Sequence, residues 1–230
     1  MLTVVVGDVH GCAGELRELL DRVGFHPASH RLLLTGDAFS RGPDPIGVWH
    51  LIRATGAAMV LGNHDDRLLR QLRAARAGDQ VELRRPHHRR TYELLQPLAA
   101  ELLPWLESLP LYLRQEEAPP GGLLLVHAGI DPVRGLTGTT REQLLSLRTW
   151  PPAGSLEGPR WYDHLGPQDG CIAFGHDAPG GLVVRRRPDG GRPWLVGLDS
   201  GCVYGGSLSA YVIEADRILQ VPSRQPALYP

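Results

Sequence analysis

The chain has 230 residues, of which 42% are hydrophobic, and a formal net charge of −1 at pH 7. So balanced a charge creates no global field that would attract nucleic acid or an anionic membrane, and we expect neither as a partner. No apolar run reaches the roughly 18 residues that a transmembrane helix requires, and the N-terminus lacks the basic segment of a signal peptide. The cysteines form no C-x-x-C pair, which favours reduced thiols and a cytoplasmic location, and they are Cys12, Cys171 and Cys202.

The first 78 residues alternate between short apolar runs and segments with helical spacing. Runs that end at a glycine predict buried strands, and they cover residues 2–6, 31–35 and 57–61. Amphipathic segments that close on a glycine predict helices, and they cover residues 14–24, 45–56 and 66–78. Strand–helix alternation at this spacing predicts a parallel sheet built from βαβ units.

The second half of the chain changes character. Residues 78–120 predict helix, proline break and helix, and we expect them to form a helical cap or insertion within one domain that spans 1–230. Residues 131–170 are rich in Gly, Pro and Trp and predict long surface loops with one short helix. Further strands are expected within residues 122–129, 170–177, 194–201 and 207–215.

Five predicted strands end in polar residues, in the sequences "VVVGDVHG", "LLTGDAFSRG", "MVLGNHD", "LLVHAG" and "IAFGHD". Taken singly, each polar residue could be a helix cap, a turn residue or a core histidine. In α/β sheets, however, ligands bind beyond the carboxyl ends of the strands, so these endings could share one rim. Carboxylate, amide and imidazole ligands together suit Mn²⁺, Fe or Zn²⁺, and two-metal sites catalyse displacement at phosphorus. The residues concerned are Asp8, His10, Asp37, Asn63, His64, His127 and His176.

The same motifs, in the same order, resemble the signature set of the phosphoprotein-phosphatase family of metallophosphoesterases. They are "GDVHG" (7–11), "GDAFSRG" (36–42), "GNHD" (62–65), "HAG" (127–129) and "GHD" (175–177). The segment "LDSGCVYGGSLSA" (198–210) is similar to the closing strands of the bacterial branch, which includes symmetrical diadenosine tetraphosphatases and small Ser/Thr protein phosphatases. The resemblance implies an α/β sandwich of two mixed β-sheets flanked by helices, with a dimetal site at the carboxyl ends of the strands.

The resemblance also implies two divalent metal ions, for which we expect Mn²⁺, with Fe, Zn²⁺ and Co²⁺ as alternatives. Asp8 and His10 would bind the first ion, and Asp37 would bridge both ions. The ligands that complete the second ion would be Asn63, His127 and His176. A hydroxide that bridges the ions would be the nucleophile.

Two further positions carry catalytic roles by the same resemblance. Arg41 would hold the substrate phosphate with its planar guanidinium, and His64 would be the general acid that protonates the leaving group. Arg148 or Arg160 could supply a second phosphate clamp.

Ser40 departs from the protein-phosphatase pattern, which has at this position an aspartate that supports the catalytic histidine. Losing that support should slow the reaction less when the leaving group is a phosphate, whose pKa is about 6 to 7, than when it is an alkoxide. We therefore favour cleavage of diadenosine tetraphosphate to two ADP over dephosphorylation of phosphoproteins. The alternatives are a bacterial Ser/Thr protein phosphatase and, from another class, an inactive metal-binding regulatory module. The chain is also shorter than typical diadenosine tetraphosphatases, which predicts a reduced nucleotide-binding insertion.

Four lesser features are also predicted, and three of them allow two interpretations. Asp65 is expected to cap the following helix. Asp177 would either support His176 or face solvent, while the basic stretch 84–90 favours a solvated, helix-flanking run over a polyphosphate site. Aromatic residues that could stack on a base or simply pack are Trp161, Tyr162 and Tyr204.

Overall fold

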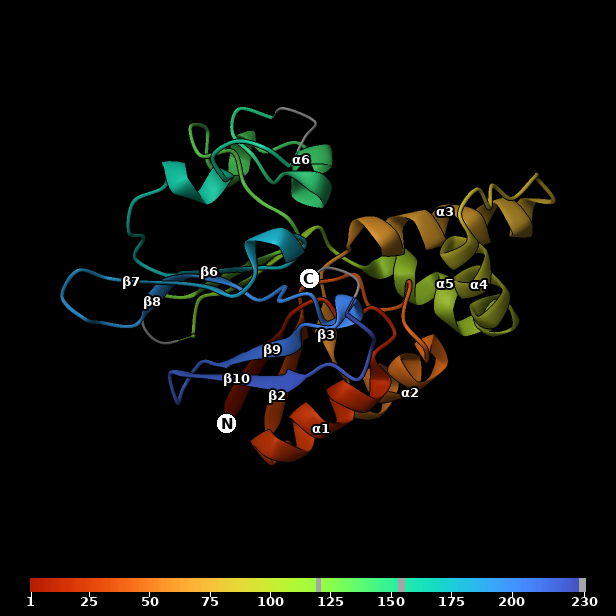
Figure 1. Ribbon diagram of the computed structural model, residues 1–230, viewed down its shortest axis with the longest axis horizontal. Coiled ribbons are helices and arrows are strands. Elements are labelled where there is room, and N and C mark those ends of the chain that lie inside the picture. The colour runs from red at the N-terminus through yellow and green to blue at the C-terminus, as the bar shows by residue number, and fades with distance from the viewer. Residues whose placement is uncertain (119–120, 153–155, 228–230) are drawn as a thin grey trace.

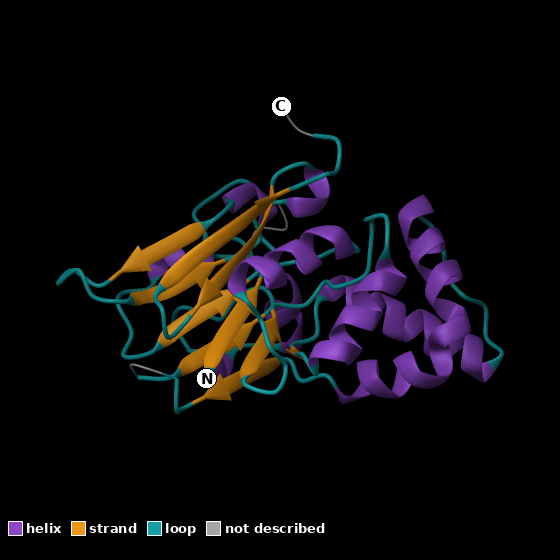
Figure 2. Cartoon of the chain, turned by 90° about the horizontal axis from the view of Figure 1, so that it is seen from below, coloured by secondary structure: helices purple, strands orange, loops and turns teal. Residues whose placement is uncertain are grey.

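The computed structural model describes residues 1–118, 121–152 and 156–227, and its centre is a pair of five-stranded mixed sheets (Figures 1 and 2). The first sheet has the order β10-β9-β1-β2-β3, in which β1, β2 and β3 run parallel and β9 and β10 add antiparallel strands. The strands are β1 (Leu2–Val6), β2 (His30–Leu34), β3 (Ala58–Met59), β9 (Ser207–Val212) and β10 (Arg217–Pro222).

The second sheet has the order β4-β5-β6-β8-β7. Its three central strands, β5, β6 and β8, are parallel to one another, and the two edge strands are antiparallel to their neighbours. The strands are β4 (Tyr112–Gln115), β5 (Leu123–Val126), β6 (Cys171–Phe174), β7 (Val183–Arg186) and β8 (Pro193–Gly197).

Helices cover the outer faces of both sheets. In the first half they are α1 (Ala13–Val23), α2 (Pro45–Thr55) and α3 (Asn63–Ala77). A helical group on one side of the molecule combines α3 with α4 (Pro86–Leu95), the 3₁₀ turn Gln96–Leu98 and α5 (Ala99–Ser108) (Figure 1). The short helix α6 (Arg141–Ser146) lies over the second sheet (Figure 1). No helix in the described part of the chain combines the length and apolarity that crossing a bilayer requires.

The alternation of side chains along the central strands explains why two sheets form. In β1, Val4 and Val6 pack against the helices, while Val5 points the other way and packs between the sheets. In β6, Ala173 lies between the sheets, while Phe174 packs under the outer segment that carries Trp161. Strands that are apolar on both faces need cover on both faces, and the sandwich provides it.

The predicted fold class is confirmed, and several boundaries differ. Helix α3 begins at Asn63 rather than at residue 66, because Gly62 is its N-cap and Asn63 and His64 form its first turn. Within the expected helical segment 78–120, residues 112–115 are β4 of the second sheet. The prediction missed β7 and β10, which are edge strands with arginines and exposed positions and therefore lack a buried apolar run. Residues 119–120 of the helical segment, 153–155 of the predicted loops and 228–230 lie outside the described residues.

Candidate metal centre and active site

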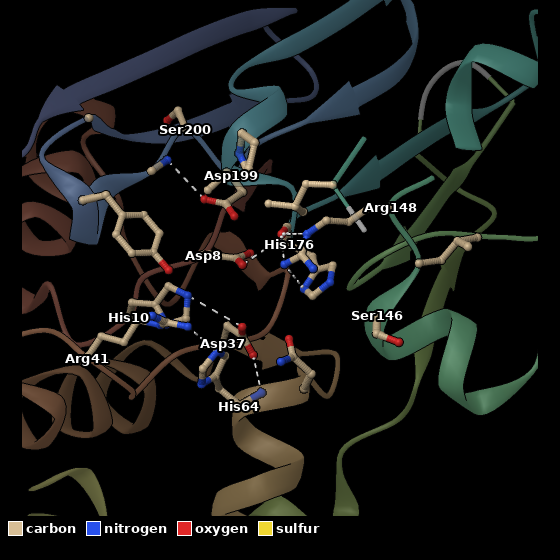
Figure 3. A pocket seen from close by; sticks show the side chains of 18 of the residues that line it. Asp8, His10, Asp37, Arg41, His64, Ser146, Arg148, His176, Asp199 and Ser200 are labelled. Carbon is tan, nitrogen blue, oxygen red and sulfur yellow. Dashed lines mark hydrogen bonds and ion pairs between the residues drawn. The ribbon is translucent and has the colours of Figure 1, made fainter. Parts of the chain in front are cut away.

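The carboxyl ends of β1, β2, β3 and β6 open into one cavity of about 1330 Å³ (Figure 3). Six of the seven residues that the strand endings predicted line this cavity, and the seventh, His127, is fully buried beside it. The six are Asp8, His10, Asp37, Asn63, His64 and His176. The topology therefore brings together residues that are up to 168 positions apart in sequence, as the contact of His176 with Asp8 shows.

Asp8 is held by neighbouring loops through both of its carboxylate oxygens. Thr35 Oγ1 donates to Oδ1 at 2.8 Å, and the backbone N–H of His176 donates to Oδ2 at 3.0 Å. The chain at Gly175 passes so close that a Cβ there would lie 1.9 Å from Asp8 Oδ1. Glycine at this position is thus a condition for bringing the end of β6 against Asp8.

Asp37 lies between two groups of candidate ligands. Its Oδ2 is 3.6 Å from His10 Nε2 and 3.7 Å from His127 Nε2, and its Oδ1 accepts a hydrogen bond of 2.9 Å from the backbone N–H of His64. That N–H belongs to the first turn of α3, where helix amides stabilise an anion. Two groups whose ligand atoms lie within 4.8 Å of one another share Asp37, namely Asp8–His10–Asp37 and Asp37–His127–His176.

The histidines present free nitrogens to these carboxylates. His127 Nδ1 donates to the carbonyl oxygen of Thr35 at 2.8 Å, which leaves a lone pair on Nε2, 3.0 Å from Asn63 Oδ1. His10 Nδ1 is 3.0 Å from Ser40 Oγ, and His176 Nε2 is buried without a partner among the residues described. Imidazoles that are anchored through one nitrogen and open at the other, next to carboxylates, form a donor set that fits divalent cations.

Burial dominates the electrostatics of this cluster. It raises the pKa of Asp8 well above its usual value, with further increases from the neighbouring Asp199 and Asp37. It also raises the pKa of Asp37 to about 7, against opposing hydrogen bonds and guanidinium charges. The pKa values of His10 and His176 are lowered well below the usual value, mainly by burial, so both imidazoles are neutral. A bound cation stabilises such a cluster most strongly when the imidazoles are neutral and the carboxylates lie close together.

Asp199 was missed by the sequence reasoning. It follows β8, lines the cavity and is 6% exposed, and its pKa is raised to about 7, chiefly by burial. Its carboxylate accepts a hydrogen bond from the backbone N–H of Gly201 at 3.1 Å. The signal was available, because "LVGLDSG" is a sixth apolar run that ends in a polar residue, here Asp199.

Backbone strain is concentrated at the same place. Five non-glycine residues in the described ranges have positive φ, and four of them are predicted site residues: His10 (47°), Asp37 (52°), Arg41 (75°) and His176 (66°). Such conformations cost on the order of 1–3 kcal/mol each and persist where the surroundings enforce them, typically at functional sites.

Arg41 and His64 lie side by side at the edge of the carboxylate cluster (Figure 3). Arg41 Nη2 is 3.1 Å from His64 Nε2, and the Arg41 guanidinium carbon is 5.4 Å from the centre of the Tyr204 ring. Burial, with smaller contributions from His10 and Arg41, lowers the pKa of His64 far below its usual value. The imidazole is therefore neutral before any phosphate binds.

Ser40 does not occupy the place that the sequence reasoning gave it. It was expected to stand where a carboxylate would support His64, yet its hydroxyl contacts Nδ1 of His10 instead. The serine side chain is short, and the tight turn with positive φ at Arg41 follows it directly. Ser40 thus orients a candidate metal ligand rather than the candidate proton donor.

The two candidates for a second phosphate clamp differ clearly. Arg148 lines the cavity, and its Nε and Nη2 donate to the carbonyl oxygen of His176 at 3.1 and 2.9 Å. Arg160 is absent from the described cavity lining, and its Nε lies 2.9 Å from Asp177 Oδ2. Asp177 is 4% exposed, so the solvent-facing interpretation was wrong, and Tyr162 Oη donates to it at 3.2 Å.

The structure also decides the expectations about the aromatic residues and about Asp65. Trp161 and Tyr162 are buried and pack against Phe174, so only Tyr204 of the three aromatic candidates lines the cavity. Asp65 does accept a hydrogen bond from the N-cap residue Gly62, as expected of a helix cap, and it also binds the backbone N–H groups of Asp37 and Ala38.

Within the basic stretch 84–90, Arg84 is 84% exposed, as a solvated run predicts. His88 is buried, however, and Arg90 donates to the carbonyl oxygens of Gly42 and Pro43, so the stretch packs beside the site.

The chain belongs to the calcineurin-like phosphoesterase family, whose sequence model matches residues 1–208. Symmetrical bis(5'-nucleosyl)-tetraphosphatases of Erwinia tasmaniensis and Aromatoleum aromaticum are each 32% identical to it, over 98% and 96% of this chain and 98% and 97% of their own lengths. The alignment with the Erwinia protein runs over 285 positions, more than the 230 residues of this chain, so that relative contains insertions that are absent here.

Solved structures agree with this assignment. A crystal structure provisionally assigned to a diadenosine tetraphosphatase is 31% identical, has a TM-score of 0.76 and covers 96% of this chain and 93% of its own. A Ser/Thr phosphatase from Saccharomyces cerevisiae is 17% identical with a TM-score of 0.62 over 100% of this chain and 81% of its own, which shows a shared fold alone.

Substituting Gly175 tests the packing around Asp8. Gly175→Ala should abolish tight binding of divalent cations, because the new Cβ would force Asp8 out of place. The measurement is Mn²⁺ titration by calorimetry. Gly166→Ala is the control, since a Cβ there meets nothing within 4 Å. Equal Mn²⁺ binding by both variants would show that the position of Asp8 does not govern cation binding.

Proposed function

We propose that this chain hydrolyses diadenosine tetraphosphate symmetrically, giving two ADP, with the help of two divalent cations. The observation that carries the proposal is the buried convergence of carboxylates and half-free imidazoles in one cavity. It occurs on a chain that aligns over nearly its whole length with enzymes named symmetrical tetraphosphatases.

The proposed ligand set follows the two groups that share Asp37. Asp8 and His10 would hold one cation, and Asp37 would serve both. The second cation would be held by Asn63, His127 and His176. When bound, two such cations lower the pKa of water and neutralise charge on the reacting phosphate. Mixed oxygen and nitrogen ligands favour Mn²⁺, with Fe, Zn²⁺ and Co²⁺ as alternatives.

Arg41 and Arg148 are the groups that we assign to phosphate binding. They lie on either side of the carboxylate cluster and both line the cavity (Figure 3). Guanidinium groups bind phosphate oxygens through paired hydrogen bonds, and a tetraphosphate offers several phosphates to bind. Tyr204, which also lines the cavity, would stack on an adenine ring.

His64 is the proposed proton donor, and its surroundings favour an anhydride substrate. The imidazole is neutral in the free protein, and the supporting hydroxyl of Ser40 is directed to His10 instead. A histidine of this kind becomes protonated only once an anionic phosphate lies beside it, so it is a weak general acid. Expelled ADP requires little protonation, whereas a serine or threonine alkoxide requires much.

We place the reaction in the cytoplasm, where the free cysteines Cys12, Cys171 and Cys202 stay reduced.

Product analysis tests the proposal directly. The Mn²⁺-loaded protein, incubated with a panel of dinucleoside polyphosphates and phosphopeptides, should prefer diadenosine tetraphosphate and release only ADP. Asp37→Asn is the matched inactive variant, because the lost charge would serve both cations. ATP and AMP as products, or a higher kcat/KM for phosphopeptides, would refute the proposed substrate. Full turnover by the Asp37→Asn variant would refute the dimetal mechanism.

The proton-donor role of His64 has its own signature. His64→Asn should keep its metal content but lower kcat by about 10²–10⁴-fold on phenyl phosphate, with a smaller loss on p-nitrophenyl phosphate, whose leaving group needs less protonation. The exposed His50→Asn is the control and should match wild type on both substrates. Equal losses on the two substrates would argue that His64 acts otherwise than by donating a proton.

The contact between Ser40 and His10 leads to a prediction about metal affinity rather than about proton transfer. Ser40→Ala removes the group that anchors Nδ1 of His10, so metal affinity should fall by about 10–100-fold, the usual cost of losing such an anchor. Ser108→Ala, at an exposed serine that bonds only within its own helix, is the control. Calorimetric Mn²⁺ titration decides the point, and unchanged affinity in Ser40→Ala would show that His10 needs no anchor.

A further inference from the structure

A second histidine cluster lies next to the proposed active site. His87 and His88 are in the first turn of α4, which Pro86 opens, and they face His64 from the first turn of α3. The three ring centres are 4.2 to 6.2 Å apart. One ligand nitrogen from each ring lies within 4.8 Å of the other two.

Each of the three imidazoles has a buried nitrogen without a partner. These atoms are His64 Nδ1, His87 Nε2 and His88 Nε2, and none of them has a hydrogen bond to any residue that the structure describes. Buried polar atoms in folded proteins are nearly always hydrogen-bonded, so three such atoms in one small cluster require an explanation. A cation bound by all three rings would account for them, with His64 in the tautomer that leaves Nδ1 unprotonated.

The cluster adjoins the proposed substrate site and shares one residue, His64, with it. His64 lines the large cavity, but His87 and His88 are not among its described lining residues. Arg41 Nη2 lies 3.1 Å from His64 Nε2 on the cavity side and can only donate, so Nε2 accepts and the ring proton lies on the unpartnered Nδ1. A cation on Nδ1 therefore requires the ring proton to move to Nε2. All three unpartnered nitrogens are buried.

Nearby charges decide which cation could bind. Burial is the main cause that lowers the pKa of both His87 and His88, and for His88 the neighbouring His87 comes next. The positive charges of Arg41, Arg67 and Arg85 lower both pKa values further, to about 4 for His88. Both rings are therefore neutral at pH 7, which is the form that binds metals. The same positive charges oppose any dication, so binding requires strong bonds to nitrogen. Zn²⁺ and Co²⁺ form such bonds, whereas Mg²⁺ and Ca²⁺ prefer oxygen ligands.

We propose that His64, His87 and His88 form a third cation site, selective for Zn²⁺ or a similar nitrogen-seeking metal, with one coordination position open. Zinc–nitrogen bonds of about 2.0–2.1 Å in tetrahedral geometry place ligand nitrogens about 3.3 Å apart. One nitrogen from each ring lies within 4.8 Å of the other two, so the rings would have to move closer together to reach this spacing.

Occupancy of the third site would regulate the enzyme, a consequence that rests on the proposed function. A cation on Nδ1 would leave the ring proton on Nε2, which could then no longer accept a hydrogen bond from Arg41. The ring would lose the contact that holds it at the cavity edge, and with it its position as general acid. Zn²⁺ beyond the two cations of the dimetal centre should therefore slow turnover, most of all on substrates with poor leaving groups.

Metal counting on the full chain tests the site without any assay of activity. Wild type, His87→Gln, His88→Gln and His50→Gln are saturated with Zn²⁺, freed of excess metal by gel filtration and analysed for zinc. Wild type and His50→Gln should hold one equivalent more than His87→Gln and His88→Gln. With Co²⁺ in place of Zn²⁺, the intense visible absorption of a tetrahedral site should appear only in the first pair. Equal zinc content and equal absorption in all four proteins would overturn the proposal.

Two controls keep the outcome interpretable. His88 is buried, so its variant could be destabilised, but His87 is only partly buried and its variant decides the question alone. Phenyl phosphate hydrolysis separates the two proposals, because excess Zn²⁺ should inhibit wild type and spare His87→Gln. If the extra zinc is lost in His87→Gln but Zn²⁺ inhibits both proteins equally, the cation site stands and the general-acid role of His64 fails.

Discussion

Three carboxylates, those of Asp8, Asp37 and Asp199, are buried together where strands β1, β2 and β8 end, and the surrounding structure is organised by the cost of that burial. Asp37 and Asp199 raise the free energy of ionising Asp8, Asp37 does the same to Asp199, and burial adds a larger penalty for all three. The chain offsets part of this cost with backbone amides, including those at the start of α3 and after β6. Under the proposed function, bound cations would offset the remainder, and the neutral imidazoles around the cluster would help to hold them.

The fold satisfies this constraint through close approach of loops at one rim. Parallel strands that belong to two different sheets deliver their polar ends to the same point, which a single hairpin-connected sheet could not do. Gly175 lets the loop after β6 lie against Asp8, and Gly62 lets the start of α3 lie against Asp37. His10, Asp37 and His176 also have positive φ angles. This local backbone strain accompanies the close approach of the candidate ligands to one another.

Residues that follow a long apolar run were predictable from sequence, because the run identifies a buried strand and the strand end identifies the rim. This reasoning found Asp8, Asp37 and His176, and it could have found Asp199, whose run has the same form. It could not find the partner of Ser40, since the direction of a short side chain depends on tertiary packing around a strained turn. His88 was assigned to a solvated run because its burial comes from the packing of α4 beside α3, which local composition does not encode.

The central claim is that the paired ligand groups around Asp37 hold two cations. Anomalous diffraction at the manganese edge, from crystals grown with Mn²⁺, tests it most directly. The account predicts two peaks that flank the Asp37 carboxylate, one beside Asp8 and His10 and the other beside Asn63, His127 and His176. A single peak, or peaks that do not contact Asp37, would contradict it.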